Sequence, residues 1–285
     1  MSLPSPTFGS ILKDWRNLRK ISQLELSFNA GISQRHISFL ETGRARPSRQ
    51  SVLTLAESLD VPLRERNVLL HAAGFAPVFS AAPLESSGME LFRHALDITL
   101  QHHEPYPAVV LNGRWNLIKA NDAALRLFSC FVEPAKLLAD PGRDFQVVRL
   151  CLSDEGLRPC IQNWAELVFA FLTRIRRLLV QNPTDEGAKG IVEEIVSHPD
   201  APQRWRDPQW TTLDPVVPMR LSKDALQVDL FTMLAHFGSA QDIVLDELKV
   251  ELFFPANPHS QAFLRELAGA DSSPTEQSRS ERSYR

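Results

Sequence analysis

Apolar residues recur at helical spacing through the first part of the chain, from Phe8 to Gly74, in short runs separated by brief turns. In the first run they are Ile11, Leu12, Trp15 and Leu18. This spacing of i, i+1, i+4 and i+7 is typical of an amphipathic helix with one buried face. Further runs extend to about residue 30, over 34–41, from 49 to about 59 and over 63–73. The pattern predicts a compact unit of five helices.

The connection between the second and third runs is very short. Gly31 tolerates the left-handed conformation that ends one helix just before the next begins. Ser22 and Ser33 precede the two helices, where a hydroxyl oxygen can accept from a free backbone N–H, and Ile32 supplies an apolar plug under the turn. A helix-turn-helix needs such a tight connection, because its second helix projects into the DNA major groove while the first lies against the backbone.

Polar residues occupy the N-terminal end of the third helix, where helices of this kind contact base edges. Arginine can pair bidentately with guanine and glutamine with adenine. The predicted base contacts are Gln34, Arg35, His36 and Ser38. Free N–H groups at a helix N-terminus and arginines flanking the turn after the third helix suit phosphate. The predicted phosphate contacts are Gln23, Ser33, Arg44, Arg46 and Arg49.

Residues 22–77 resemble the Xre or lambda-repressor-like helix-turn-helix family over nearly their whole length. The S-Q opening, the A-G-I-S turn, the L-E-T-G ending, the R-P-S-R step and the R-E-R-N-x-L-L-x-A-A-G-F extension occur in order at family spacing. The resemblance implies that Gln23 and Ser33 contact phosphate and that Gln34 and Arg35 contact bases, with His36 able to do either. Leu24 and Phe28 are apolar where the family is often polar, so they cover local surface, pack on the fifth helix or meet a partner subunit.

A segment rich in Pro, Ser and small residues, 76–90, indicates a connection between domains. Beyond a helix expected over about 89–102, the period changes to a strand-like run at 108–111. Asn112-Gly113 then predicts a tight hairpin turn whose central residues both have positive φ, with a returning strand over 115–120. Asn121-Asp122 offers a cap for a helix that extends through Phe131.

A long helix is predicted from Ile161 to Gln181, and it must be buried on more than one side because 167–172 is nearly apolar all round. Apolar and polar residues then alternate over 226–230 and 248–252. This alternation predicts two antiparallel strands, each with one wet face, that turn around Gly238 to Asp242. The tail from Asp271 is polar, and we expect it to be disordered.

The second part of the chain resembles the PAS-like ligand-binding domain of MmyB-like regulators. The likeness is carried by P-A-V-V-L-N-G-R-W-N-L-I-K-A-N-D-A-A at 107–124, the Leu/Phe helix from Trp164 and the closing strand up to Phe254-Pro255. It implies an apolar cavity between sheet and helices and a fatty-acyl type of ligand. Candidate lining residues are Trp115, Phe128, Trp164, Phe171 and Phe237, which could equally form an ordinary core. Candidate partners for a carboxylate headgroup are Arg114, Arg158 and His236.

The fold class is therefore an all-α five-helix helix-turn-helix domain followed by an α+β PAS-like domain with a small antiparallel sheet. A length of 285 residues suits two domains. The predicted division is a DNA-binding domain at 1–76, a linker at 77–89, a ligand-binding domain at 90–269 and a disordered tail at 270–285. Residues 1–80 carry ten Lys and Arg against six Asp and Glu, a net +4, whereas the remainder carries 21 against 28, a net −7. Opposite charges on the two parts suggest two different partners.

Several classes of protein find little support. No apolar run approaches the roughly 18 residues of a membrane span, and the N-terminus lacks a secretory signal, so we expect a cytoplasmic, nucleoid-associated protein without a membrane partner. Cys130, Cys151 and Cys160 are an odd number without a C-x-x-C pair, which favours reduced packing residues over a metal or redox site. We expect neither a metal nor a cofactor.

Catalytic motifs such as G-x-S-x-G and H-E-x-x-H are missing from the sequence. The acidic residues Asp242, Asp246, Glu247 and Glu251 are more typical of a solvated strand face than of a catalytic pair. The sequence thus predicts a bacterial transcription regulator, with a repressor favoured, that binds a palindromic double-stranded operator as a homodimer. A small apolar, fatty-acid-like ligand would modulate it. The alternatives are an enzyme and a protein-interaction adaptor with a vestigial helix-turn-helix.

Overall fold

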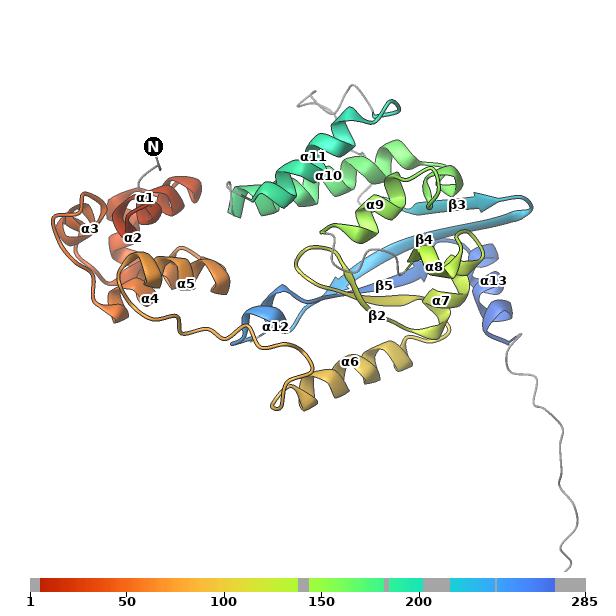
Figure 1. Cartoon of the computed structure of the whole chain (residues 1–285), viewed down its shortest axis with the longest axis horizontal. Coiled ribbons are helices and arrows are strands. Elements are labelled where there is room, and N and C mark those ends of the chain that lie inside the picture. Colours follow the sequence, from red (N-terminus) through yellow and green to blue (C-terminus); the bar gives the residue numbers. More distant parts are fainter. Residues whose placement is uncertain (1–5, 138–143, 182–184, 202–215, 239, 270–285) are drawn as a thin grey trace, which may run out of the picture. The chain divides into compact units, whose positions relative to one another are not determined.

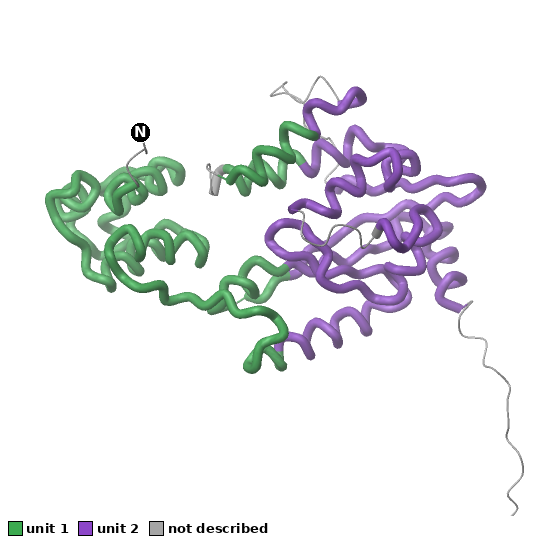
Figure 2. The backbone as a smooth tube through the Cα atoms, in the orientation of Figure 1, with its two compact units in different colours: residues 1–91, 172–194, 236–248 green, residues 92–171, 195–235, 249–285 purple. Residues whose placement is uncertain are grey.

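The computed structural model describes residues 6–137, 144–181, 185–201, 216–238 and 240–269. The tail from Asp271 that the sequence predicts to be disordered lies outside these residues. The chain forms two compact units (Figure 2). Unit 1 comprises 1–91, 172–194 and 236–248, and unit 2 comprises 92–171, 195–235 and 249–285. Each unit is therefore assembled from segments that are distant in sequence.

Unit 1 begins with the five predicted helices (Figure 1). They are α1 (Phe8–Leu18), α2 (Gln23–Ala30), α3 (Gln34–Glu41), α4 (Arg49–Ser58) and α5 (Leu63–Ala72). The predicted caps are confirmed: the hydroxyl of Ser22 accepts from the N–H of Glu25 at 3.0 Å, and that of Ser33 from the N–H of His36 at 3.3 Å. Gly31 ends α2 with φ of 64°, as the turn requires.

One apolar core holds these helices together. Its fully buried members include Leu12, Leu26, Ile37, Leu40, Val52, Leu55, Leu69 and Leu70. Burying one such side chain stabilises the fold by about 1.5–3 kcal/mol. At Gly9 the packing is so close that a Cβ atom would lie 2.4 Å from the carbonyl oxygen of Leu40 and 2.7 Å from that of Glu41. Helix α1 therefore meets the end of α3 backbone against backbone.

The rest of unit 1 includes α12 (Ile243–Glu247), the C-terminal part of α10 (Trp164–Gln181) and most of α11 (Glu186–Ser197). The two late strands pair antiparallel as predicted, but the connection between them, predicted as a turn around 238–242, contains helix α12. Asp242 begins this helix, with its carboxylate accepting from the N–H of Val244 at 2.8 Å, and Ile243 and Leu245 are buried. The capping side chain and the apolar residues thus favour a helical turn over a hairpin.

Unit 2 is built on an antiparallel sheet that has five strands within the described residues, in the order β2-β1-β5-β4-β3. The strands are β1 (Ala108–Leu111), β2 (Leu117–Ala120), β3 (Met219–Lys223), β4 (Leu226–Ala235) and β5 (Lys249–Pro255). All four residues of β1 are buried, in accord with their continuous apolar run. The predicted α+β architecture is confirmed.

The loop from β1 to β2 differs from the predicted tight turn. The residue with positive φ is Trp115, at 57°, and not Gly113. The N–H of Asn112 donates to the carbonyl of Asn116 at 3.1 Å, while the Asn112 side chain accepts from the N–H groups of Arg114 and Asn116. This side chain competes for the loop's backbone donors, so the chain forms a longer loop and β2 begins only at Leu117.

Helices cover both faces of the sheet, with α6 and α10 on opposite faces (Figure 1). Helix α6 spans Glu90–His102 and belongs to unit 2 from residue 92 onward. Unit 2 also contains α7 (Asp122–Ser129), α8 (Pro134–Leu137), α9 (Gln146–Leu152), a short 3-10 helix (Arg158–Cys160) and α13 (Pro258–Gly269). Leu167, Val168, Phe171, Leu172 and Ile175 of α10 are all buried. These residues follow i, i+3 and i+4 spacing and so form one broad buried face, while Phe169 and Ala170 are only partly buried. The prediction of burial on more than one side is therefore wrong.

Two acidic residues contradict the predicted solvated face. Asp242 and Glu251 are buried. Asp242 caps α12, and Glu251 lies next to Val250 on β5, which is also buried, so both faces of the sheet are covered at this point. The described residues contain no disulfide among the cysteines, and burial raises the pKa of Cys151 to about 12. In the same residues, no helix has the length and apolar character needed to cross a membrane, and no cluster of His, Cys, Asp or Glu is arranged to hold a metal.

Candidate nucleic-acid interface and ligand-binding domain

Helix α3 has two faces of opposite character. Ile37 and Leu40 are buried in the core. Of the four predicted base contacts, Gln34 and Arg35 are exposed and His36 and Ser38 are partly exposed. The guanidinium of Arg35 lies 5.3 Å from the ring centre of Phe39, one turn further along the helix. The N-terminal half of α3 therefore presents hydrogen-bonding side chains to solvent from a rigid support.

A nearly buried ion pair connects α1 to α3. The guanidinium of Arg16 donates to both carboxylate oxygens of Glu41, at 2.6 and 3.0 Å, and the two side chains are only 11% and 2% exposed. Burial opposes the charge of Glu41, but hydrogen bonds from Arg16 and Gln23 outweigh it, so the pKa of Glu41 lies below its ordinary value. The hydrogen bond to Glu41 likewise raises the pKa of Arg16. Both groups are charged at neutral pH.

Gln23, the first residue of α2, is held by the same carboxylate. Its amide nitrogen donates to Glu41 at 2.8 Å, and its second amide hydrogen makes no hydrogen bond within the described part of the chain. Ser33 stands at the exposed start of α3. These two residues therefore lie at the N-termini of the two helices, where free backbone N–H groups favour an anion.

The three predicted phosphate-contacting arginines are all exposed, and they are Arg44, Arg46 and Arg49. The first two lie in the loop after α3, which is closed by the N–H of Arg44 donating to the carbonyl of Phe39 at 2.8 Å. Arg49 is the first residue of α4, after the capping Ser48. Their exposure and their position beside α3 fit contacts with a DNA backbone.

Leu24 and Phe28 depart from the family pattern and lie one turn apart on α2. They are 49% and 78% exposed, respectively. This exposure excludes the alternative that they pack on α5. Within the described part of the chain they are surface residues, so covering local surface and meeting a partner subunit are the two alternatives left.

In unit 2 the structure brings together two of the predicted pocket residues. The rings of Trp115 and Phe171 meet edge to face with centroids 5.6 Å apart, and both side chains are buried. Trp164 lies on the same helix as Phe171, between the guanidinium of Arg158 at 4.4 Å and the ring of His198 at 4.5 Å.

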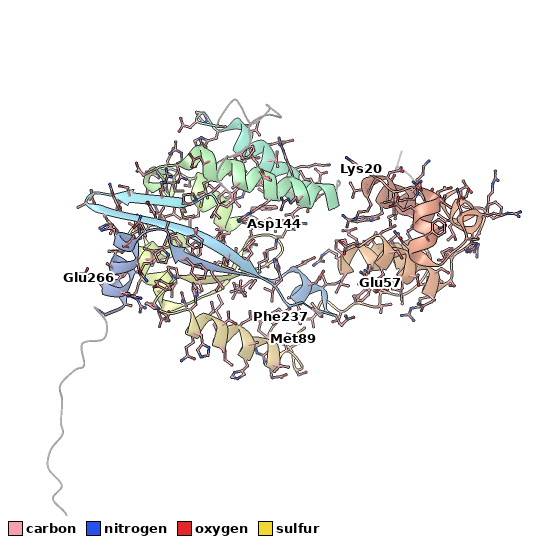
Figure 3. The ribbon with its side chains drawn as sticks, turned by 180° about the vertical axis from the view of Figure 1, so that it is seen from behind. Lys20, Glu57, Met89, Asp144, Phe237 and Glu266 are labelled. Carbon is pink, nitrogen blue, oxygen red and sulfur yellow. The ribbon has the colours of Figure 1, made fainter. Side chains whose placement is uncertain are left out.

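The other two pocket candidates lie elsewhere. Phe128 packs on Phe253 of β5, with ring centroids 5.7 Å apart. Phe237 belongs to unit 1 and lies on the segment between β4 and α12 (Figure 3). Trp115 and Phe171 are therefore the pair that the structure supports most directly as neighbours.

Trp115 itself and a second buried aromatic residue, Phe145, have left-handed backbone conformations. Trp115 has φ of 57° and Phe145 has φ of 62°. The loops that carry them are joined, since the N–H of Phe145 donates to the carbonyl of Arg114 at 2.7 Å and that of Val147 to the carbonyl of Trp115 at 3.2 Å. Such conformations cost on the order of 1–3 kcal/mol in bulky residues and concentrate at functional sites. The sequence contains no signal for either conformation.

The candidate headgroup ligands differ in their surroundings. Arg114 has the carboxylate of Asp144 at 3.8 Å. Arg158 forms an ion pair with Asp200 and lies over Trp164. His236 is exposed and belongs to unit 1. Both arginines thus already have an acidic neighbour that a carboxylate ligand would have to displace or accompany.

The capped turn and the solvent-facing polar side of α3 define a helix-turn-helix DNA-binding domain. Residues 12–66 match the family model described as "Helix-turn-helix". Residues 92–267, well over half of the chain, match the model described as "MmyB-like transcription regulator ligand binding domain". The chain belongs to this MmyB-like family of transcription regulators, with a helix-turn-helix domain before the ligand-binding domain.

Comparison with curated proteins finds no match. Among solved structures, one is titled "Structure of an RNA-binding Light-Oxygen-Voltage Receptor". The sequence identity is 12%, the TM-score is 0.25, and the match covers 94% of the present chain. The chain spans 62% of the length of that protein. A likeness at this level supports no argument about fold or function.

Proposed function

We propose that this DNA-binding regulator is a repressor in the bacterial cytoplasm that binds a palindromic operator as a homodimer. The observation that carries the proposal is the construction of α3, whose buried side is fixed by Ile37 and Leu40 while Gln34 and Arg35 face solvent. One short recognition helix contacts only a few base pairs, so two copies related by a two-fold axis give a site of useful length.

In this proposal Gln34, Arg35, His36 and Ser38 contact bases. Contacts to phosphate position the domain and come from Gln23, Ser33, Arg44, Arg46 and Arg49. The proposed division of the chain is 1–76 for DNA binding, 77–89 as connection and 90–269 for ligand binding. The +4 charge of residues 1–80 supports contact between this end of the chain and DNA.

The proposed ligand is a small apolar molecule of fatty-acyl type, bound beside Trp115 and Phe171. The edge-to-face contact of these two rings and the left-handed conformation of Trp115 support this position. A ligand alters operator affinity only if it binds two arrangements of the protein with different affinity. We propose that it does so, with the ligand-free protein bound to DNA.

Selection of bound sequences from a random DNA pool by the full-length protein tests the first proposal. We expect enrichment of a palindrome, with log affinity falling steeply as log salt rises. The matched variants are Arg35→Ala, which should relax the preference at one position of each half-site, and the exposed Glu57→Gln on α4, which should select the unchanged palindrome. A pool without enrichment together with a flat salt response would refute sequence-specific DNA binding.

Native mass spectrometry with saturated fatty acids of increasing chain length tests the ligand proposal. We expect one bound molecule per chain at an optimal length, and weaker binding in Phe171→Ala. The exposed Ile98 on α6 provides the control variant, Ile98→Ala, which should bind as the unmodified protein does. Equal binding by both variants would show that the ligand lies away from Phe171.

A further inference from the structure

Residues 236–248 belong to the ligand-binding domain by sequence and to the DNA-binding unit by their contacts. They lie inside the 92–267 match to the ligand-binding family, and they connect β4 to β5 along the chain. By their contacts, however, they belong to unit 1, the unit that carries the helix-turn-helix. A segment of the ligand-binding domain is thus packed with the DNA-binding helices.

The N-terminus of α5 lies beside α12 and lacks a capping side chain of its own. Thr7, Ser22, Ser33 and Ser48 cap the four preceding helices with their own side chains. Within the described residues, α5 has Pro62 at this position and no capping side chain of its own. Asp246, from α12, lies at this end of α5, where the backbone N–H of Leu63 favours the charged form of its carboxyl group and so opposes the rise that burial causes in its pKa. An acidic side chain at a helix N-terminus satisfies a free donor and is favoured by the helix dipole.

An ion pair reinforces this contact. The guanidinium of Arg64 donates to both carboxylate oxygens of Glu247, at 2.6 and 3.0 Å. The two side chains are 52% and 33% exposed, so water screens the pair and its strength alone is modest. Its bidentate geometry nevertheless fixes the orientation of α12 against the first turn of α5.

The connecting segment 78–82 is bound on both sides. On the side of α5, Asn67 accepts from the N–H groups of Val78 and Phe79, at 3.0 and 3.1 Å, and donates to the carbonyl of Phe79 at 2.7 Å. On the side of α12, the N–H of Ile243 donates to the carbonyl of Ser80 at 2.8 Å.

The carboxylate of Asp242 also accepts from the N–H of Ala82, at 3.1 Å. The chain that leaves the DNA-binding helices is therefore hydrogen-bonded to α5 and to α12 at successive residues. We call α5, residues 78–82 and α12 together the α5–α12 junction. Because its backbone and side-chain donors are paired, this connection is a structured element and not a loose tether.

We propose that the α5–α12 junction transmits ligand binding to the DNA-binding helices. The proposal rests on the proposed function, in that a ligand of unit 2 controls operator affinity. β4 and β5 belong to the sheet of the ligand-binding unit and are the two strands that α12 joins. A displacement of either strand shifts α12, because the chain joins it to both strands. Helix α12 in turn contacts the first turn of α5 and is hydrogen-bonded to the segment 78–82.

Hydrogen exchange of the full-length protein tests the junction without a ligand or DNA. Val250→Ala loosens the start of β5, three residues after the end of α12, where the valine is buried. We expect it to raise exchange at Val78, Phe79 and the first turn of α5 by about 2- to 5-fold, the effect of losing up to about 1 kcal/mol of local stability. In a protein that already carries Asp246→Ala, Val250→Ala should have no further effect on these amides.

A second variant keeps the test decisive if Asp246→Ala unfolds the domain. Glu247→Arg reverses one charge of the ion pair and should raise hydrogen exchange at the same amides. The charge-swapped double variant, Glu247→Arg with Arg64→Glu, should return hydrogen exchange to the rate of the unmodified protein. The matched control is Glu186→Arg, which breaks an exposed ion pair with Lys189 on α11 and should leave the junction unchanged. If the hydrogen-exchange rates of the Val78 and Phe79 amides were unchanged in both Val250→Ala and Glu247→Arg, the proposal would be overturned.

Operator binding separates this proposal from the proposed function. With DNA selected by the unmodified protein, Glu247→Arg should change affinity by about 5-fold or more, the lower range of allosteric coupling, while Glu186→Arg should not. An unchanged affinity in Glu247→Arg would also overturn the proposal. If the unmodified protein selects no DNA, the proposed function fails, while the exchange experiments still decide whether β5 and α5 are coupled.

Discussion

Replacing Glu41 by glutamine keeps the size of the side chain but removes the negative charge to which Arg16 of α1 and Gln23 of α2 both donate hydrogen bonds. The change leaves the guanidinium of Arg16, only 11% exposed, without its counter-charge, and it weakens two hydrogen bonds of 2.6 and 3.0 Å. Hydrogen bonds to charged groups contribute about 1.5–3 kcal/mol each. Glutamine retains one carbonyl acceptor and Arg16 regains some hydration, so we expect a net loss of about 3 kcal/mol in the free energy of unfolding of the DNA-binding helices.

The effect should depend on pH in a defined direction. The pKa of Glu41 in the folded protein is below its ordinary value, so its charge stabilises the fold above the pKa of the unfolded chain. This contribution disappears as the pH falls through the lowered pKa. The difference in stability between the unmodified protein and Glu41→Gln should therefore be constant near neutral pH and shrink below about pH 4.5, the ordinary value for glutamate.

Urea unfolding followed by pulsed hydrogen exchange of peptides from residues 8–41 measures this difference within the full-length protein. Glu57→Gln is the control, because Glu57 is exposed on α4 (Figure 3), and it should change stability by less than about 0.5 kcal/mol. Equal stability of the two variants, or a difference that persists unchanged at acid pH, would refute the role assigned to Glu41.

Further outcomes follow from other residues. Arg35→Ala should weaken the free energy of operator binding by about 1–3 kcal/mol and relax base preference. Arg46→Ala should weaken binding to all sequences and lower the slope of log affinity against log salt by about one, which competition binding at several salt concentrations would measure. Gly9→Ala should destabilise the DNA-binding helices by about 1–3 kcal/mol in urea unfolding, because its Cβ would lie 2.4 Å from a backbone oxygen that cannot move aside. Cys151, with its pKa raised to about 12, should resist alkylation at pH 8 until the protein unfolds. Burial raises the pKa of Glu65, so Glu65→Gln should stabilise unit 1 in thermal unfolding at neutral pH, and this gain should shrink as the pH falls below the raised value and be absent below about pH 4.5.

The DNA-binding helices could be predicted from sequence because their signals are local. A serine before a helix and a glycine after it act within one turn, so Ser22, Gly31 and Ser33 could be assigned without tertiary information. The exposure of Arg35 follows from the burial of Ile37 two residues later, since residues two apart point to different sides of a helix, and Gln34 is exposed as the first residue of α3.

Prediction failed where distant residues decide the local structure. Asn112-Gly113 favours a two-residue turn, but the Asn112 side chain captures two backbone donors and moves the left-handed residue to Trp115. Strand alternation indicated that Glu251 faces water, yet both Glu251 and its neighbour Val250 are buried, so both faces of β5 are covered there. Helix α12 was missed because five residues are too few for periodicity to distinguish a helix from a turn.

The two faces of α3 separate what keeps the domain folded from what selects its DNA. Ile37, Leu40 and Glu41 are committed to the interior, while Gln34 and Arg35 touch little of the protein. Substitutions at the exposed positions are therefore nearly free of folding cost, typically within about 0.5 kcal/mol. Duplicated copies of such a gene can drift toward new operators one residue at a time without passing through an unfolded ancestor.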